Sequence, residues 1–192
     1  MHNQDIEDLA VAIGQVIPFV CKEWNENNLQ LFETAYRGKS FRQIFAGRQT
    51  QEKTKAISPI IDEIFSEFIE EKLPAFEITE GKGKDYTINS TWVEWKNSLS
   101  EEICWTGNGY AKTNWHVLCK FILNKDGIIE KYFACIIPYD EMGFKWSDTG
   151  NSNFSTLNLL SEDYDKIIRI AGDFTKKPKY LYFEPVDYVA PT

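Results

Sequence analysis

Apolar residues in the first part of the chain recur every three or four positions, which is the period of an α-helix. The positions that carry this pattern at the start are Ile6, Leu9, Ala10, Ile13, Ile17 and Val20. Pro18 lies among them, and because proline has no backbone N–H we expect it to kink or end the helix. A shorter amphipathic helix is predicted from Leu29 to Tyr36, and the strongest one spans Ile57 to Ile69 before Pro74 closes it.

After Pro74 the pattern changes to short segments rich in β-branched and aromatic residues, which favour strands. The predicted strands are Tyr86 to Ile88, Trp92 to Trp95, Trp115 to Leu123 and Ile128 to Ile137. Lys125 to Gly127, between the last two, predict a hairpin turn.

The final part of the chain mixes the two patterns. Residues 148–153 are typical of a polar loop, residues 154–157 of an extended segment and residues 179–183 of a final strand. Ser161 is placed to begin a helix for which Gly172 is a plausible end. Helices therefore come first, then strands, then a helix and a strand, which predicts an α/β fold with helices flanking a central mixed sheet.

A length of 192 residues is that of one domain. We therefore treat residues 1–192 as one unit, with a helical first third (1–74) and an α/β remainder (75–192). A hydrophobic content of 43% and an aromatic content of 15% are enough for a packed core and exclude intrinsic disorder. The net charge of −8 argues against binding to nucleic acid through bulk positive charge. A local groove is not excluded, because acidic and basic residues are equal in number between Glu80 and Asp126.

The four cysteines lie far apart in the sequence and the chain has only two histidines, so we do not expect a structural zinc site. Isolated cysteines in apolar segments are typical of buried free thiols in a reducing compartment. The longest apolar stretch, residues 10–21, follows acidic residues and is too short to span a bilayer. We therefore predict a cytoplasmic protein with no membrane partner.

The chemically distinctive segment runs from Glu80 to Ser98. Side chains alternate along a strand, so Glu94 and Lys96 project from one face while Trp95 is buried on the other. If the two predicted strands pair as a hairpin, Asp85 can come within reach of Glu94. Carboxylate oxygens are ligands that Mg²⁺ prefers, and an adjacent lysine stabilises negative charge in a transition state.

The order Asp85, then Glu94, Trp95 and Lys96, resembles the D…(D/E)-x-K signature of the PD-(D/E)XK nuclease superfamily. The resemblance implies a restriction-endonuclease-like fold, with a central mixed β-sheet flanked by helices. It also implies an Mg²⁺ cofactor held by Asp85, Glu94 and the backbone carbonyl of Trp95. Lys96 would then position the attacking water.

Other residues extend the resemblance over residues 80–138. Ser98, shortly after the lysine, and the short spacing look like type II restriction endonucleases. Glu80 and the polar segment 112–116 are similar to the small, blunt-cutting branch of these enzymes, which makes Glu80 an auxiliary acidic candidate. Lys84 departs from the signature, since it stands where the name-giving proline would be.

Polar side chains around the motif are candidates for DNA contacts. The loop expected between Trp105 and His116 mixes glycines, amides, a lysine and a histidine, and such groups can hydrogen-bond to base edges. An ordinary connecting loop, with His116 satisfied locally, fits the same residues. The candidate contacts are Asn97, Ser98, Asn108, Lys112, Asn114 and His116.

Functions of two classes fit these observations. By resemblance, the first is a type II restriction endonuclease: a homodimer, joined through its N-terminal helices, that hydrolyses double-stranded DNA at a short palindromic site. Its products would carry 5′-phosphate and 3′-hydroxyl ends, and a structure-specific or repair nuclease is a variant of the same idea. The alternative is a non-enzymatic acidic binding protein, such as an immunity protein or DNA mimic, which an acidic, aromatic-rich surface also suits.

Overall fold

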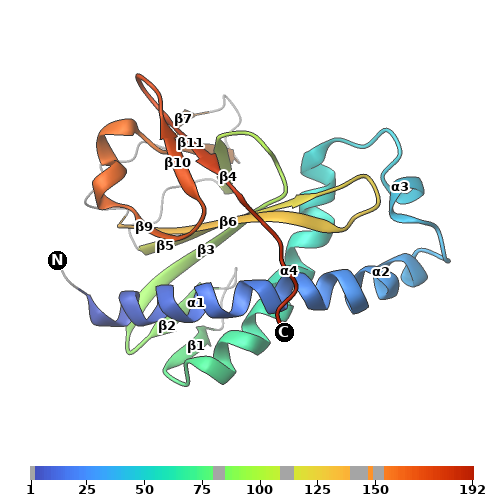
Figure 1. Ribbon diagram of the computed structural model, residues 1–192, viewed down its shortest axis with the longest axis horizontal. Helices are drawn as coiled ribbons and strands as arrows, with labels where there is room; N and C mark the ends of the chain where they lie inside the picture. Colours follow the sequence, from blue (N-terminus) through green and yellow to red (C-terminus); the bar gives the residue numbers. More distant parts are fainter. Residues whose placement is uncertain (1–2, 80–84, 109–114, 139–146, 149–153) are drawn as a thin grey trace.

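The computed structural model describes residues 3–79, 85–108, 115–138, 147–148 and 154–192. At residues 78–79, 85, 106–108, 147–148 and 154–156 it describes the backbone and not the side chains. The fold is mixed α/β, with a helical N-terminal region followed by strands (Figure 1). This coarse architecture agrees with the prediction from the sequence.

Helices of the N-terminal region follow one another closely along the chain. They are α1 (Gln4–Glu23), the π-helical turn η1 (Trp24–Asn28), α2 (Leu29–Ala35), α3 (Phe41–Ile44) and α4 (Thr50–Lys72). Helix α1 continues past Pro18 into η1, so the helix does not end at this proline. Ile17 and Val20 are buried on either side of it. Their burial outweighs a proline penalty of roughly 3 kcal/mol.

Most regular elements in the rest of the described chain are strands. They are β1 (Phe76–Thr79), β2 (Asp85–Ile88), β3 (Thr91–Ser98), β4 (Cys104–Asn108), β5 (Trp115–Leu123), β6 (Ile129–Pro138), β7 (Ser147–Asp148), β8 (Phe154–Asn158), β9 (Ile168–Ala171), β10 (Asp173–Lys176), β11 (Leu181–Glu184) and β12 (Val186–Asp187). The central sheet has the order β1-β2-β3-β5-β6-β12, and β9 also pairs with β6. Strands β3 and β5 run parallel and the other pairs in it are antiparallel, so the sheet is mixed. Strands β4-β8-β7 form a second sheet and β10-β11 a separate hairpin.

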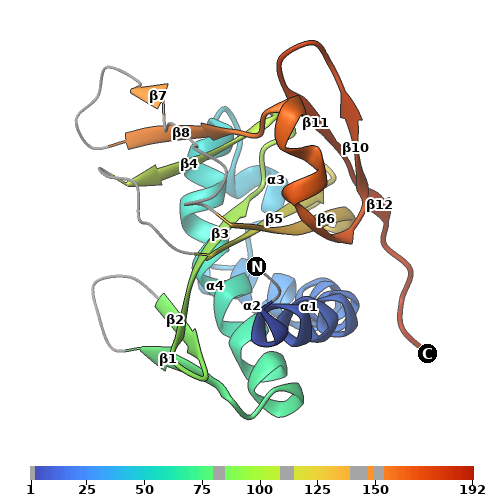
Figure 2. The same ribbon diagram turned by 90° about the vertical axis from the view of Figure 1, so that its left-hand side faces the viewer.

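The two faces of the central sheet are covered by different elements. Helices α1 and α4 pack on one face, while β4, β8 and the β10-β11 hairpin lie on the other side (Figure 2). Val93 and Val117 belong to the core on the helix side, whereas Leu118 and Phe133 belong to the core on the opposite side. Strand alternation thus sorts neighbouring residues into two separate cores.

The hairpin predicted around Gly127 is confirmed, since β5 and β6 pair antiparallel across it. Gly127 has a φ of 87°, and a side chain there would press on Phe41. Its carbonyl oxygen accepts a hydrogen bond of 2.8 Å from Trp24 Nε1. The turn is therefore held against the helical region by contacts between residues that lie far apart in the sequence.

The helix expected after Ser161 is only partly present. Residues Ser161–Lys166 form a short 3₁₀ helix, η2, and β9 follows where the helix was expected to continue. Pairing of Ile168 with Ile136 of β6 favours the strand there. Gly172 has a φ of 81° and turns the chain from β9 into β10. The strand predicted at residues 179–183 corresponds to β11, and the short strand β12 follows it as the last element.

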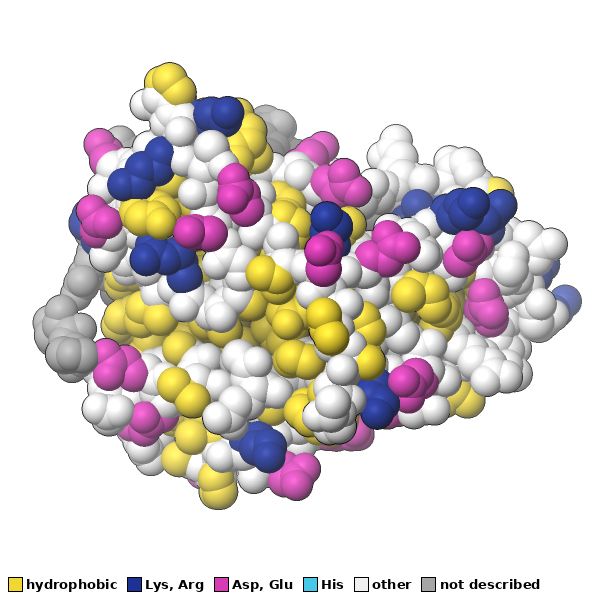
Figure 3. Space-filling model, viewed as in Figure 1, with side chains coloured by type: hydrophobic (Ala, Val, Ile, Leu, Met, Phe, Trp, Pro, Cys, Tyr) yellow, Lys and Arg dark blue, Asp and Glu magenta, His cyan; other side chains and the backbone are white. Residues whose placement is uncertain are grey.

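The cysteines, the surface charges and the helix lengths bear on the predictions made from composition. All four cysteines are free; Cys21, Cys119 and Cys135 are buried as predicted, whereas Cys104 is only partly buried. Acidic and basic side chains are interspersed on the face shown in Figure 3, with an apolar band across its middle. None of the helices that the structure describes is long and apolar enough to cross a membrane.

Candidate functional site

The two strands that carry the motif pair as a hairpin, which is the condition under which Asp85 can approach Glu94. Asn89 and Ser90 make the turn, and both have positive φ angles, of 45° and 71°, as in the tight turns that match the twist of paired strands. Tyr86 pairs with Val93, so the next backbone positions along the ladder are 85 and 94. Asp85 and Glu94 are therefore each one residue beyond the last pair of this ladder, and the side chain of Asp85 is outside the described part.

Glu94 and Lys96 lie in contact on one face of β3. Lys96 Nζ donates a hydrogen bond to Glu94 Oε1, and the side chains are 24% and 6% exposed, respectively. Val93 and Trp95 are buried on the opposite face, as the alternation predicts. Because the Glu94 carboxylate is almost removed from water, loss of the lysine would leave a buried charge without this partner.

The parallel neighbour β5 adds a histidine to this face. The register pairs Glu94 with His116 and Lys96 with Leu118, and paired positions present their side chains to the same face. His116 is fully buried within β5, so it does not lie in a loop, and its burial argues against a DNA contact. The segment from Trp105 to His116 is not one loop either, because its ends belong to β4 and β5.

Asn97 and Ser98 are engaged inside the protein. Asn97 projects toward α4, where its Nδ2 donates to Asp62 and its Oδ1 accepts a 2.8 Å hydrogen bond from Trp95 Nε1. Ser98 Oγ accepts the backbone N–H of Ser100 at 3.1 Å. Strand alternation explains the outcome for Asn97, since it is two residues from Trp95 and therefore shares the buried helix face. This placement argues against a DNA contact for Asn97.

The remaining predicted residues cannot be placed at the site. Glu80, Lys112 and Asn114 lie outside the described residues. Asn108 ends β4, where its backbone pairs with Phe154, and its side chain lies outside the described part. Their suggested roles stay predictions.

A second buried ammonium group, which the sequence reasoning missed, lies further along the same face. Lys120 is fully buried, and its Nζ donates to the backbone carbonyls of Ser100 at 3.1 Å and Cys104 at 2.9 Å. It also lies 4.4 Å from the centre of the Trp105 ring. Burial lowers its pKa from 10.5 to about 8, and the nearby Cys104 and Glu102 raise it in part. A single lysine inside an apolar predicted strand was the signal for this group.

The site is thus a buried carboxylate with its lysine, beside a buried histidine, with Asp85 one residue beyond the last β2–β3 pair. Among the side chains that the structure describes, no three acidic, histidine or cysteine groups gather as metal ligands. Comparison of the chain with protein-family models, curated proteins and solved structures found no match. The functional argument therefore depends on the chemistry of these residues alone.

Proposed function

We propose that this protein is a Mg²⁺-dependent endonuclease that hydrolyses phosphodiester bonds in double-stranded DNA. The observation that carries the proposal is the contact between Glu94 and Lys96 on one face of β3, with Asp85 one residue beyond the last β2–β3 pair. The resemblance of these residues to the PD-(D/E)XK signature favours a type II restriction endonuclease with a restriction-endonuclease-like sheet. A mixed central sheet packed against α1 and α4 supports that reading.

Donor groups at this place suit a hard divalent cation. The carboxylates of Asp85 and Glu94 and the carbonyl of Trp95 are the oxygen donors that would hold Mg²⁺. Glu94 is already restricted by burial and by its contact with Lys96, so little conformational freedom remains to be lost on binding. The bound ion would supply a water of lowered pKa and would offset charge on the phosphate.

Lys96 is suited to act on the reacting groups. Its ammonium group touches Glu94, and its side chain as a whole is 24% exposed. An ammonium group has three donors, and one that bonds to a carboxylate can still donate to a water or a phosphate oxygen. Its positive charge then stabilises the negative charge that grows on the phosphate in the transition state.

A homodimer on a palindromic site is part of the proposal, because two-fold protein symmetry matches two-fold DNA symmetry. Large apolar side chains on the N-terminal helices favour this region as the contact. Val11 of α1 is 61% exposed and Leu31 of α2 is 65% exposed. Sedimentation of the protein with and without the changes Val11→Glu and Leu31→Glu tests the contact; an unaltered oligomeric state would contradict it.

Cleavage of plasmid DNA tests the activity. We expect discrete fragments in the presence of Mg²⁺ and none after chelation. Lys96→Met, Glu94→Gln and Asp85→Asn should each lower the rate by roughly 100-fold or more, the loss typical of a group that stabilises a transition state. The matched controls Lys125→Met and Glu71→Gln remove the same charges at exposed positions away from β3 and should leave the rate unchanged.

Each outcome separates the candidates. Discrete fragments that disappear in the three site variants support a restriction enzyme, whereas a smear of products supports a structure-specific or repair nuclease. Absence of cleavage with every divalent cation tried contradicts the proposal. Tight binding to a basic protein in that case favours the acidic binding protein.

A further inference from the structure

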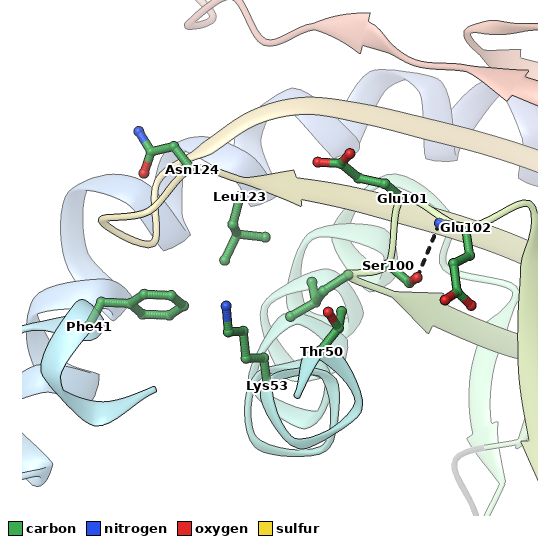
Figure 4. Close-up of a pocket in the computed structure, with 9 residues that line it drawn as sticks. Phe41, Thr50, Lys53, Ser100, Glu101, Glu102, Leu123 and Asn124 are labelled. Atoms are coloured by element: carbon green, nitrogen blue, oxygen red, sulfur yellow. Dashed lines mark hydrogen bonds between the residues drawn. The ribbon is translucent and has the colours of Figure 1, made fainter. Parts of the chain in front are cut away.

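A cavity of about 480 Å³ lies between the first turn of α4, helix α3 and the ends of β3 and β5 (Figure 4). It begins where β3 ends, and Phe41 and Leu99 on its walls belong to the core on the helix side of the sheet. It is therefore separate from the face that carries Glu94 and Lys96. Its volume lies within the roughly 300–1,000 Å³ usual for small-molecule sites.

Part of the wall is apolar and firmly packed. Phe41 is 3% exposed and Leu99 is 8% exposed, and the half-buried Leu123 lines the cavity with them. Rigid apolar groups of this kind form a surface for an aliphatic or aromatic side chain. A ligand without an apolar part would leave this surface uncovered.

The polar part of the wall carries opposite charges on different elements. Lys53 of α4 points into the cavity between Phe41 and Leu123, whereas Glu101 lies on the segment after β3 (Figure 4). Within the described part of the chain, Lys53 and Glu101 form no ion pair with each other. Both charged residues thus line this cavity, and each belongs to a different element.

We propose that this cavity binds a small zwitterion with an apolar body, of the class of free hydrophobic α-amino acids. The carboxylate of the ligand would lie beside Lys53 and the hydroxyl of Thr50, and its ammonium beside Glu101. Its side chain would pack on Phe41 and Leu123. Polyanions such as nucleotides fit poorly, because Glu101 and Glu102 both line the cavity and repel them.

Isothermal titration calorimetry on the full chain tests the ligand class. L-leucine, L-methionine and L-phenylalanine are the probes, and we expect saturable binding of at least one. 4-Methylpentanoate lacks the ammonium of leucine and 3-methylbutylamine lacks its carboxylate, so each should bind at least about tenfold more weakly than leucine, the usual loss for a charged hydrogen bond. Glycine lacks the apolar part and should also bind more weakly.

Variants test the two charged groups. Lys53→Met and Glu101→Gln should each lower the affinity for the best-binding probe by about tenfold. Lys125→Met and Glu71→Gln make the same charge changes at exposed positions outside the cavity and should have no effect. The proposal is overturned if no probe binds at up to about 10 mM. It is equally overturned if binding is insensitive to both cavity variants, with circular dichroism showing each variant folded.

Discussion

Replacement of Lys120 by methionine should change how the stability of the protein depends on pH. The lysine is fully buried on β5, where two backbone carbonyls and the Trp105 ring surround its ammonium group. Methionine has a similar length and no charge, so it keeps most of the packing and removes the titrating group. The comparison therefore isolates the cost of keeping this ammonium away from water.

The direction and size of the effect follow from the pKa of Lys120. Burial lowers this pKa from 10.5 to about 8 in the folded protein. Between these values the unfolded chain binds more protons than the folded one, so the free energy of unfolding rises with pH. A pKa shift from 10.5 to about 8 corresponds to a loss of about 3 kcal/mol in the free energy of unfolding. This loss is complete at pH values below the folded-state pKa and disappears at pH values above the unfolded-state pKa.

Urea unfolding of both proteins at several pH values is the assay. The difference in unfolding free energy, wild type minus Lys120→Met, should rise by about 2 kcal/mol between about pH 7.5 and about pH 9.5. Taking the difference cancels the contribution of the buried tyrosines and cysteines to the pH dependence, because these groups are present in both proteins. A difference that stays flat or falls over this range would refute the reasoning. It would mean that the two carbonyls and the aromatic ring fully replace water around the ammonium group.

Two further predictions concern the link between the β5–β6 turn and the helices. Gly127→Ala should lower the free energy of unfolding by roughly 3 kcal/mol, because the added Cβ would lie 2.5 Å from Phe41 ring atoms at a positive φ. The control is Gly38→Ala, where φ is also positive but the space is open, and it should lower the free energy of unfolding by only about 1 kcal/mol. Equal losses in urea unfolding would show that the clash with Phe41 is relieved at no cost. Trp24→Phe leaves the Gly127 carbonyl without its 2.8 Å hydrogen bond and should cost about 1–3 kcal/mol. An unaltered urea midpoint would mean that this bond contributes nothing to stability.

Local patterns in the sequence were enough to predict much of the framework. The apolar stripe of α4 and the β5–β6 hairpin follow from periodicity and turn residues, which depend on neighbours along the chain. The start of α4 at Thr50 was not predicted, because the first turns of this helix are polar and carry no apolar stripe. Strand alternation also placed Glu94 and Lys96 together on one face, and the structure confirms it.

The surroundings of that pair depended on contacts between distant segments. Pairing of β3 with β5 brings His116 beside Glu94, and the segment after β3 folds over Lys120. Pairing with β6 makes a strand of Ile168 to Ala171, a segment expected to be helical.

The sequence by itself determined which residues share a face of a helix or strand, since that depends on the repeat of the backbone alone. Only the tertiary structure decided which of these faces are buried. Burial of Glu94, His116 and Lys120 depends on elements that lie far away in the chain and cover them. Desolvation, and with it the charge and reactivity of such groups, is a property of the assembled layers and not of any one segment.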